Sequence, residues 1–173
     1  MATTPIKIIS YSILLFITIS IANGKVQPPQ STLVFYLQDV RKGPKATVSP
    51  IIGINGKVWS YNTFGTILVV DDPITISPSS YSTQIGRAQG IITVTSQDGT
   101  NVNIVLSLVF NNAQYTSSTL EIQGTSCQRD NLRELGVVSG TGRFRFARGF
   151  AVFETISTYS QSVIRLNVTL AIP

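Results

Sequence analysis

The sequence predicts an all-β fold, and within that class it favours an eight-stranded antiparallel β-barrel over a β-sandwich. Strand-forming segments follow one another at short spacing, separated by Gly, Asp and Pro turn residues. No segment shows a convincing 3.6-residue period except the short stretch 131–135, which allows one turn of helix. The chain has 173 residues, enough for one domain. A barrel is favoured because eight strands can close without leaving an edge and still enclose a small ligand.

The first part of the chain is expected to be removed before folding. Residues 1–24 are predicted to be a signal peptide, with Lys7 as its charged region, an apolar stretch and small residues at the cleavage site. This stretch is short for a membrane span, and no later run of eighteen apolar residues exists. Residues 25–31 (KVQPPQS) are predicted to be a flexible leader. The folded domain is then expected over 32–173, in an exported protein without a membrane span.

Seven segments of the sequence are predicted to be strands. The second of them contains Gly65 as a bend and ends at Asp71-Asp72-Pro73, a strand-to-turn exit in which Asp72 is able to face the cavity mouth. The turn signal Asp98-Gly99 separates the third from the fourth. The strand segments are 33–37, 59–70, 85–96, 102–110, 119–123, 144–156 and 163–172.

The last segment alternates most clearly, with Ile164, Leu166 and Val168 on one face and Asn167 on the other. Asn167 begins the glycosylation sequon Asn-Val-Thr. If Asn167 points outward, as the alternation suggests, a glycan is sterically possible at this position.

The stretch 138–149 (VSGTGRFRFARG) has three possible interpretations. It does not fit a phosphate-binding loop, because the spacing of its glycines differs from both known patterns and no helix follows. Its alternating Arg and Phe residues resemble an RNA-binding strand, but an exported protein rarely meets RNA. The preferred interpretation is a turn over Ser139–Gly142, with residues at positive φ, and a strand from Arg143 onward.

Composition excludes several classes of chemistry. There is no histidine, which removes Ser-His-Asp and Cys-His nucleophile systems and the usual zinc sites. Cys127 is the single cysteine, so no intrachain disulfide can form. Without Lys7, 12 basic and 8 acidic residues remain, a net charge of about +4 that suits an acidic cell-wall matrix. No nucleic-acid partner and no metal or other cofactor is expected.

Five sequence blocks, in order and spanning about residues 32–172, resemble the plant dirigent protein family. The resemblance implies an eight-stranded antiparallel barrel, lipocalin-like or allene-oxide-cyclase-like, with a ligand cavity in each subunit of a homotrimer. The blocks are 34–39 (VFYLQD), 64–67 (FGTI) with 71–75 (DDPIT), 85–90 (IGRAQG), 108–110 (LVF) with 118–120 (STL) and Gly124, and 133–142 (RELGVVSGTG) with 144–149 (FRFARG).

The resemblance also implies a function in the plant apoplast or cell wall. Members of the family hold phenoxy radicals derived from monolignols, which a separate laccase or peroxidase supplies, so that they couple with one stereochemistry. This belongs to lignan, lignin or defence phenolic biosynthesis. Two rivals remain open: an acid-catalysed dehydratase or cyclase of a phenolic substrate on the same barrel, and a non-catalytic phenolic-binding wall protein.

Three residues carry over from the family's site. Asp39 maps to an aspartate that acts on a quinone methide, and burial at the end of an apolar strand would raise its pKa; the alternative is a cap of the following turn. Arg133 maps to a catalytic arginine able to bind a phenolic oxygen, or else forms an ion pair with Glu134 or Asp130. Thr155 maps to a cavity threonine, or is an ordinary strand residue.

Three departures from the lignan-forming members are expected to alter the cavity. Ile92 and Val94 stand where those members carry tyrosines, and Ser126 stands where they carry a second aspartate. Phenol binding and proton transfer should both differ as a result, so the substrate is not expected to be the one those members use.

Overall fold

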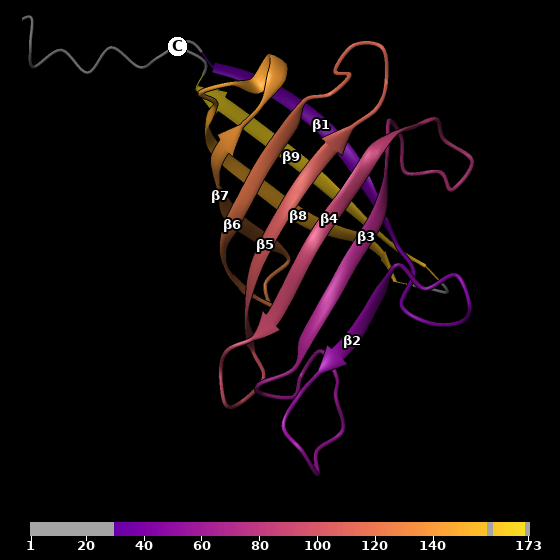
Figure 1. Cartoon of the computed structure of the whole chain (residues 1–173), viewed down its shortest axis with the longest axis vertical. Coiled ribbons are helices and arrows are strands. Elements are labelled where there is room, and N and C mark those ends of the chain that lie inside the picture. The colour runs from indigo at the N-terminus through magenta and orange to yellow at the C-terminus, as the bar shows by residue number, and fades with distance from the viewer. Residues whose placement is uncertain (1–29, 159–160, 172–173) are drawn as a thin grey trace, which may run out of the picture.

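Nine strands and one 3-10 turn make up the part of the chain that the structure, a computed structural model, describes: residues 30–158 and 161–171 (Figure 1). The expected signal peptide and nearly all of the expected leader lie outside these residues. The first strand begins at Gln30, two residues ahead of the expected domain start. The elements are β1 (Gln30–Asp39), β2 (Val48–Ile52), β3 (Ile67–Thr75), β4 (Gln84–Val94), β5 (Asn101–Phe110), β6 (Thr119–Cys127), β7 (Leu132–Gly140), η1 (Gly142–Phe144), β8 (Arg148–Thr158) and β9 (Ser162–Ala171).

The strands form a closed antiparallel barrel with eight positions in its wall. From β2 to β9, each strand pairs with the next along the chain. β1 closes the barrel, because it pairs with β9 along its whole length and with the end of β3 through Tyr36 and Leu37. β2 pairs with the first half of β3. Both β1 and β2 therefore lie beside β3 and together occupy one of the eight strand positions in the wall, with residues 40–47 as a break between them. The predicted eight-stranded antiparallel barrel is confirmed.

Alternation along the strands separates the core from the outer surface. In β9, Leu166, Val168 and Leu170 are completely buried, whereas Arg165 and Asn167 on the opposite face are only partly buried. The predicted alternation of this segment is therefore confirmed. Asn167 lies opposite Val34 of β1 and Val152 of β8, in the middle of the sheet, and its glycosylation stays a prediction.

One end of the barrel is filled by aromatic side chains. Phe110, at the end of β5, contacts Phe35, Tyr115 and Phe144 with ring centroids 5.3–5.4 Å apart in tilted orientations. Such tilted pairs add to the free energy that the rings gain by leaving water. We call these four residues the aromatic plug. It closes this end, so any ligand must enter the barrel from the other.

Between β1 and β4, the structure differs from the sequence-based prediction. Residues 59–66, expected as strand, form turns, and β3 begins only at Ile67. Gly65 has φ of +83°, which fits a turn rather than a strand bend. Conversely, Asp71 to Pro73 lie inside β3 and do not end it. The error came from the aromatic run, whose strand-like composition reflects packing at the barrel mouth. β2 was missed, because the short segment around Pro50 has little periodicity.

The second half of the chain also corrects two expectations. Residues 131–135 do not start a helix, since Leu132 begins β7. The strand expected from Arg143 begins only at Arg148, because η1 and a turn come first. Phe144 is buried in the plug, whereas Phe146 is 71 % exposed at φ of +67°, so the apparent alternation of Arg and Phe is not that of a strand.

The predicted Asp-Gly turn between β4 and β5 is confirmed. Gly99 has φ of +73°, and a side chain there would meet the Asn62 carbonyl oxygen at 2.1 Å. Asp98 accepts hydrogen bonds from the backbone N–H and the hydroxyl of Thr100. The close approach of Gly99 to Asn62 places the hairpin against the loop that precedes β3. The described residues include no helix of the length and apolarity that a membrane crossing requires.

Candidate functional site

A cavity of about 90 Å³ lies inside the barrel, away from the aromatic plug, and all eight positions of the wall contribute to it. Its walls are mainly apolar, with side chains such as Leu37, Val70, Leu106 and Phe153. A few polar groups converge on this apolar space, as in most small-molecule sites. The polar lining residues are Asp39, Arg41, Tyr61, Asp72, Ser126, Gln128 and Arg133.

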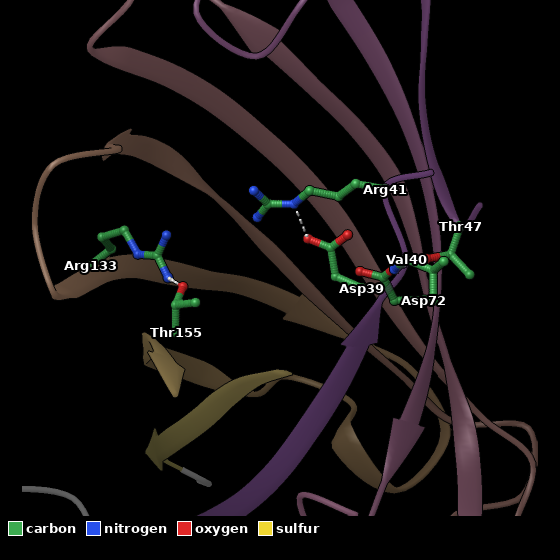
Figure 2. Close-up of polar contacts among 7 residues, drawn as sticks. All are labelled: Asp39, Val40, Arg41, Thr47, Asp72, Arg133 and Thr155. Atoms are coloured by element: carbon green, nitrogen blue, oxygen red, sulfur yellow. Dashed lines mark hydrogen bonds and ion pairs between the residues drawn. The ribbon is translucent and has the colours of Figure 1, made fainter. Parts of the chain in front are cut away.

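Asp39 ends β1 at the point where the chain leaves the barrel wall. Its side chain is buried, with 4 % of the residue exposed, and its Oδ2 accepts a hydrogen bond from Arg41 Nε at 2.9 Å (Figure 2). The other oxygen, Oδ1, has no hydrogen-bond partner among the described residues. Burial raises the pKa of Asp39, and the positive charge of Arg41 offsets only part of that rise. Asp39 therefore contributes to the lining of the cavity a buried carboxyl group in which one oxygen has no hydrogen-bond partner among the described residues.

A second carboxyl group lies beside the first because of strand register. Leu37 of β1 is opposite Ile74 of β3, so two residues further along both strands Asp39 comes opposite Asp72. Both side chains line the cavity, and Figure 2 shows them next to each other. Such a like-charged cross-strand pair is unfavourable when both groups are ionised.

Asp72 is held in place by Thr47, from the segment that interrupts the β1–β2 position. The Thr47 hydroxyl donates to Asp72 Oδ1 at 2.5 Å and accepts from the Val40 backbone N–H at 2.9 Å. Only 3 % of Asp72 is exposed. Burial raises the pKa of Asp72 to about 8, and the neighbouring charge of Asp39 adds to the rise, while the Thr47 hydrogen bond lowers it. At neutral pH the Asp72 carboxyl is therefore mainly protonated.

The mouth of the cavity is shaped by Tyr61 and Arg41. The Arg41 guanidinium lies 4.9 Å above the Tyr61 ring, a cation–π contact. The Tyr61 hydroxyl is buried and has no hydrogen-bond partner within the described part of the chain. Burial and the charge of Asp39 raise the pKa of Tyr61 to about 12, so the phenol stays neutral. Gln128 fixes this loop, since its Nε2 donates to the carbonyl oxygens of Tyr61 and Gly99.

Arg133 reaches into the cavity from the other side of the barrel. Its Nη2 donates to the Thr155 hydroxyl at 2.7 Å, and its Nε is buried without a partner in the residues described (Figure 2). Burial lowers the pKa of the guanidinium, and the nearby charge of Arg41 lowers it further. No ion pair with Glu134 or Asp130 is found in the described residues. Arg133 thus keeps a hydrogen-bond donor free for a ligand.

The other predicted site residues are divided between the cavity and its surroundings. Ile92 and Ser126 line the cavity. Thr155 is not a lining residue but orients Arg133. Val94 faces the same side of β4 as Ile92 but is packed into the core, 1 % exposed, and does not line the cavity. The structure therefore brings together Asp39, Arg133, Ile92 and Ser126.

Sequence reasoning missed three polar residues of the cavity lining, which are Arg41, Tyr61 and Gln128. Their sequence context gives no sign that they meet. Asp72 was noted as able to face the cavity mouth, and the alternation of Leu68, Val70 and Asp72 along β3 would have supported that orientation.

A closed barrel with buried carboxyl and guanidinium groups in an apolar cavity is typical of proteins that bind a small molecule inside a β-barrel. The chain belongs to the dirigent family: the family described as Dirigent-like protein matches residues 30–171. Proteins of this family are typically extracellular.

Similar proteins include pterocarpan synthases and proteins named dirigent protein. Pterocarpan synthase 1 of Glycyrrhiza echinata is 40% identical over 120 residues, which are 69% of this chain and 64% of that protein. The chain therefore spans less than two thirds of the length of that relative. Dirigent protein 11 of Arabidopsis thaliana is 32% identical over 170 residues, 91% of this chain and 88% of that protein. The solved structure of the pterocarpan synthase dirigent protein GePTS1 superposes with a TM-score of 0.75 at 32% identity, covering 84% of this chain and 86% of that one.

Proposed function

We propose that this protein binds one phenolic molecule at a time and promotes its dehydration or ring closure by proton transfer through Asp39. The observation that carries the proposal is the buried carboxyl group of Asp39, which lines an apolar cavity and whose Oδ1 has no hydrogen-bond partner among the described residues. A carboxyl group kept away from water with a raised pKa is suited to general acid–base catalysis.

The reaction class follows from what a carboxyl group can do to a phenol. A phenol with a hydroxyl on the benzylic carbon loses water once that hydroxyl is protonated and the phenolic proton is removed. The product is a quinone methide, to which an internal hydroxyl adds to close a ring. An apolar cavity protects this reactive intermediate from bulk water, which would otherwise add to it. The relatives named pterocarpan synthase support a ring-closing reaction of this kind.

Arg133 supports the same proposal from across the cavity. Its free Nε offers a charge-assisted hydrogen bond to an oxygen of the ligand. The Thr155 hydroxyl holds the guanidinium in position. The phenolic oxygen gains negative charge as its proton leaves, and a fixed cation stabilises that charge.

Cavity size favours a single substrate. A cavity of about 150 Å³ binds one benzene molecule in another protein, and the one here measures about 90 Å³. Because this is smaller than the benzene-binding cavity, it leaves room for at most one aromatic ring, and the remainder of the molecule would lie in the mouth beside Arg41 and Tyr61. Simultaneous binding of two phenylpropanoid radicals would require the mouth to open.

Stereoselective coupling of phenoxy radicals from a laccase or peroxidase is the second candidate function. It is favoured by the relation to proteins named dirigent protein, which match over most of the chain. In this case the cavity would orient one radical, with Arg133 on its oxygen, and the second radical would approach from the mouth. Lignan, lignin or defence phenolics would then be the products.

The proposed setting is the plant apoplast, with the chain secreted as a homotrimer. An apolar row on the outer surface supports association: Val69, Ile91 and Val105 are opposite one another on β3, β4 and β5, each about 40 % exposed. We expect other copies of this chain to cover that row. Light scattering on the purified protein should give three times the monomer mass, and Ile91→Lys should reduce it to one.

A product assay distinguishes the candidates. The protein is incubated with phenolic benzylic alcohols that carry a second phenol, and in parallel with monolignols plus a laccase, and products are separated by chiral chromatography. Ring-closed product without any oxidase, lost in Asp39→Asn, supports the first function. Enantiomeric excess that appears only with laccase, at an unchanged oxidation rate, supports the second. If neither appears while a phenol still binds, the protein is a non-catalytic binding protein.

A further inference from the structure

We propose that Asp72 is a second catalytic carboxyl group of this site, which gives its proton to the leaving hydroxyl while Asp39 takes the proton of the phenol. This inference rests on the proposed dehydration and ring closure, and it adds a residue and a division of roles. It begins from the register that places Asp72 opposite Asp39 on neighbouring strands inside the cavity.

The two carboxyl groups have different partners, and this difference sets their roles. Asp39 accepts a hydrogen bond from the Arg41 guanidinium, which favours the ionised form. Asp72 has no cation within hydrogen-bonding distance in the described residues, and its partner is the neutral hydroxyl of Thr47. A carboxylate beside a cation is suited to be the base, and a neutral carboxyl group beside it is suited to be the acid.

Charged and titratable groups around Asp72 agree with this assignment. Asp39 faces it from β1, Asp71 precedes it in β3, and both raise its pKa. Arg41, from the segment after β1, lowers the pKa but is bound to Asp39. On the β4 side, the residue opposite is Ala88, which is neutral. Burial is the largest cause, and together these groups place the pKa at about 8.

The full reaction balances over both carboxyl groups. In the first half, Asp72 donates its proton to the benzylic hydroxyl, the C–O bond breaks and water leaves, while the Asp39 carboxylate removes the phenolic proton. This yields the neutral quinone methide, an ionised Asp72 and a protonated Asp39. In the second half, an internal hydroxyl adds to the quinone methide carbon and loses its proton to Asp72, while Asp39 returns a proton to the carbonyl oxygen. Both groups end in their starting state, and no oxidant is needed.

Asp72 belongs to the block 71–75 that resembles the dirigent family, whereas Ser126 stands where the lignan-forming members carry a further aspartate. Both residues line the cavity, so the site keeps the carboxyl pair of Asp39 and Asp72 although it lacks the carboxyl group at position 126.

The test uses 4-hydroxybenzyl alcohol, a single-ring phenol with a benzylic hydroxyl, in water labelled with oxygen-18. Loss of water gives a quinone methide, and addition of labelled water restores the alcohol with the heavy oxygen, which mass spectrometry detects. The exchange rate above the protein-free background is measured from pH 4 to pH 10 for the full-length protein and its variants. Thermal melting of each variant checks that it is folded.

For the wild type we expect an exchange rate that falls above about pH 8, where Asp72 loses its proton. Asp72→Asn should lower the rate at least ~100-fold and abolish this alkaline fall. Asp71→Asn is the matched control, because Asp71 is the neighbouring carboxylate on the outer surface, paired with Arg87; its rate should stay within about twofold of wild type.

Thr47 provides a second test that needs no loss of the carboxyl group. Its hydrogen bond lowers the pKa of Asp72, so Thr47→Val should move the alkaline fall to higher pH, and Thr47→Ser should leave it in place. A structural role of Asp72 alone would not produce this shift.

The outcomes separate this inference from the proposed function. Exchange by the wild type, with Asp72→Asn equally active and showing the same alkaline fall, would overturn the role of Asp72 and leave Asp39 as the only proton-transferring group. A wild-type rate no higher than background would overturn both.

Discussion

At the closed end of the barrel, four aromatic rings with centroids 5.2–5.4 Å apart fill the space between the strands. At the open end, two carboxyl groups, a phenol and a guanidinium are buried around a cavity. Both ends use the same strands and the same inward alternation. They differ in whether the inward side chains satisfy one another.

Hydrogen bonding makes the difference plain. The buried side-chain atoms without a partner in the described residues are Asp39 Oδ1, Tyr61 OH, Thr66 Oγ1 and Arg133 Nε, and none belongs to the plug. Each such atom costs about 1–3 kcal/mol of stability. The first, second and fourth line the cavity. The closed end therefore stabilises the fold. The open end contains unpaired polar groups that lower the stability of the fold and that a ligand can satisfy.

The largest expected effect is on activity, from Asp39→Asn. Removing the proton-transferring group should lower turnover of a phenolic benzylic alcohol by about 10²–10⁴-fold, the usual contribution of general acid–base catalysis. The midpoint of thermal unfolding should not fall, because the variant no longer buries a carboxylate. Since the charge of Asp39 raises the pKa of Asp72, the remaining activity should also decline at a lower pH. Unchanged turnover would show that the open end is not a catalytic site.

Phe110→Ala is the opposite experiment, at the closed end. The ring is 2 % exposed and contacts the other three members of the plug. Its removal should lower the free energy of unfolding by about 3–5 kcal/mol, measured in urea. The folded fraction should keep its turnover per active molecule. A selective loss of activity at normal stability would contradict the separation of the two ends.

Asp72→Asn should change how stability depends on pH. The folded-state pKa of about 8 lies above the ordinary 3.8, so the folded protein holds a proton that the unfolded chain releases above pH 4. Wild-type stability therefore contains a contribution that is lost as pH rises toward 8, about 3 kcal/mol between pH 5 and pH 8. The variant should lack this decline in urea titrations at the two pH values. A parallel decline in both proteins would mean that Asp72 is not the group responsible.

The smallest effect is expected from a substitution on the outer face of β3 and β4. Arg87 and Asp71 form an ion pair at 2.5 Å, but Asp71 is half exposed. Solvent screens such pairs, so Arg87→Ala should change the free energy of unfolding by less than ~1 kcal/mol and leave turnover unaffected. A larger loss would indicate that this surface is covered by another copy of the chain.

Much of the fold was predictable because barrel strands leave a local signature. Alternation marked β9, the Asp98-Gly99 pair marked the hairpin between β4 and β5, and Asp39 was expected to end an apolar strand. The failures arose where composition imitated a strand. Aromatic residues from 59 to 64 belong to the turns before β3, and the Arg-Phe alternation after Gly142 belongs to η1 and a turn.

The candidate site was predictable only in part. Asp39, Arg133, Ile92 and Ser126 were named from the sequence, and all four line the cavity. Val94 was named with them but is core, because it lies at the end of β4, where the loop before β3 covers it through the Gly65 N–H and the Val94 carbonyl. Arg41 and Tyr61 could not be named, since no local pattern indicates that two loop residues meet over a cavity.

The sequence by itself determined the class of fold and which side chains of a strand point into the barrel. Both depend on alternation and turn residues, which act over a few positions along the chain. Tertiary structure alone decided that Asp39 faces Asp72. That pairing depends on closure of the barrel between β1 and β3, because more than thirty residues of the chain, including the interruption at 40–47, separate Asp39 from Asp72. The protonation of Asp72 is decided there as well, because burial and a neighbouring carboxylate exist only once the barrel has closed.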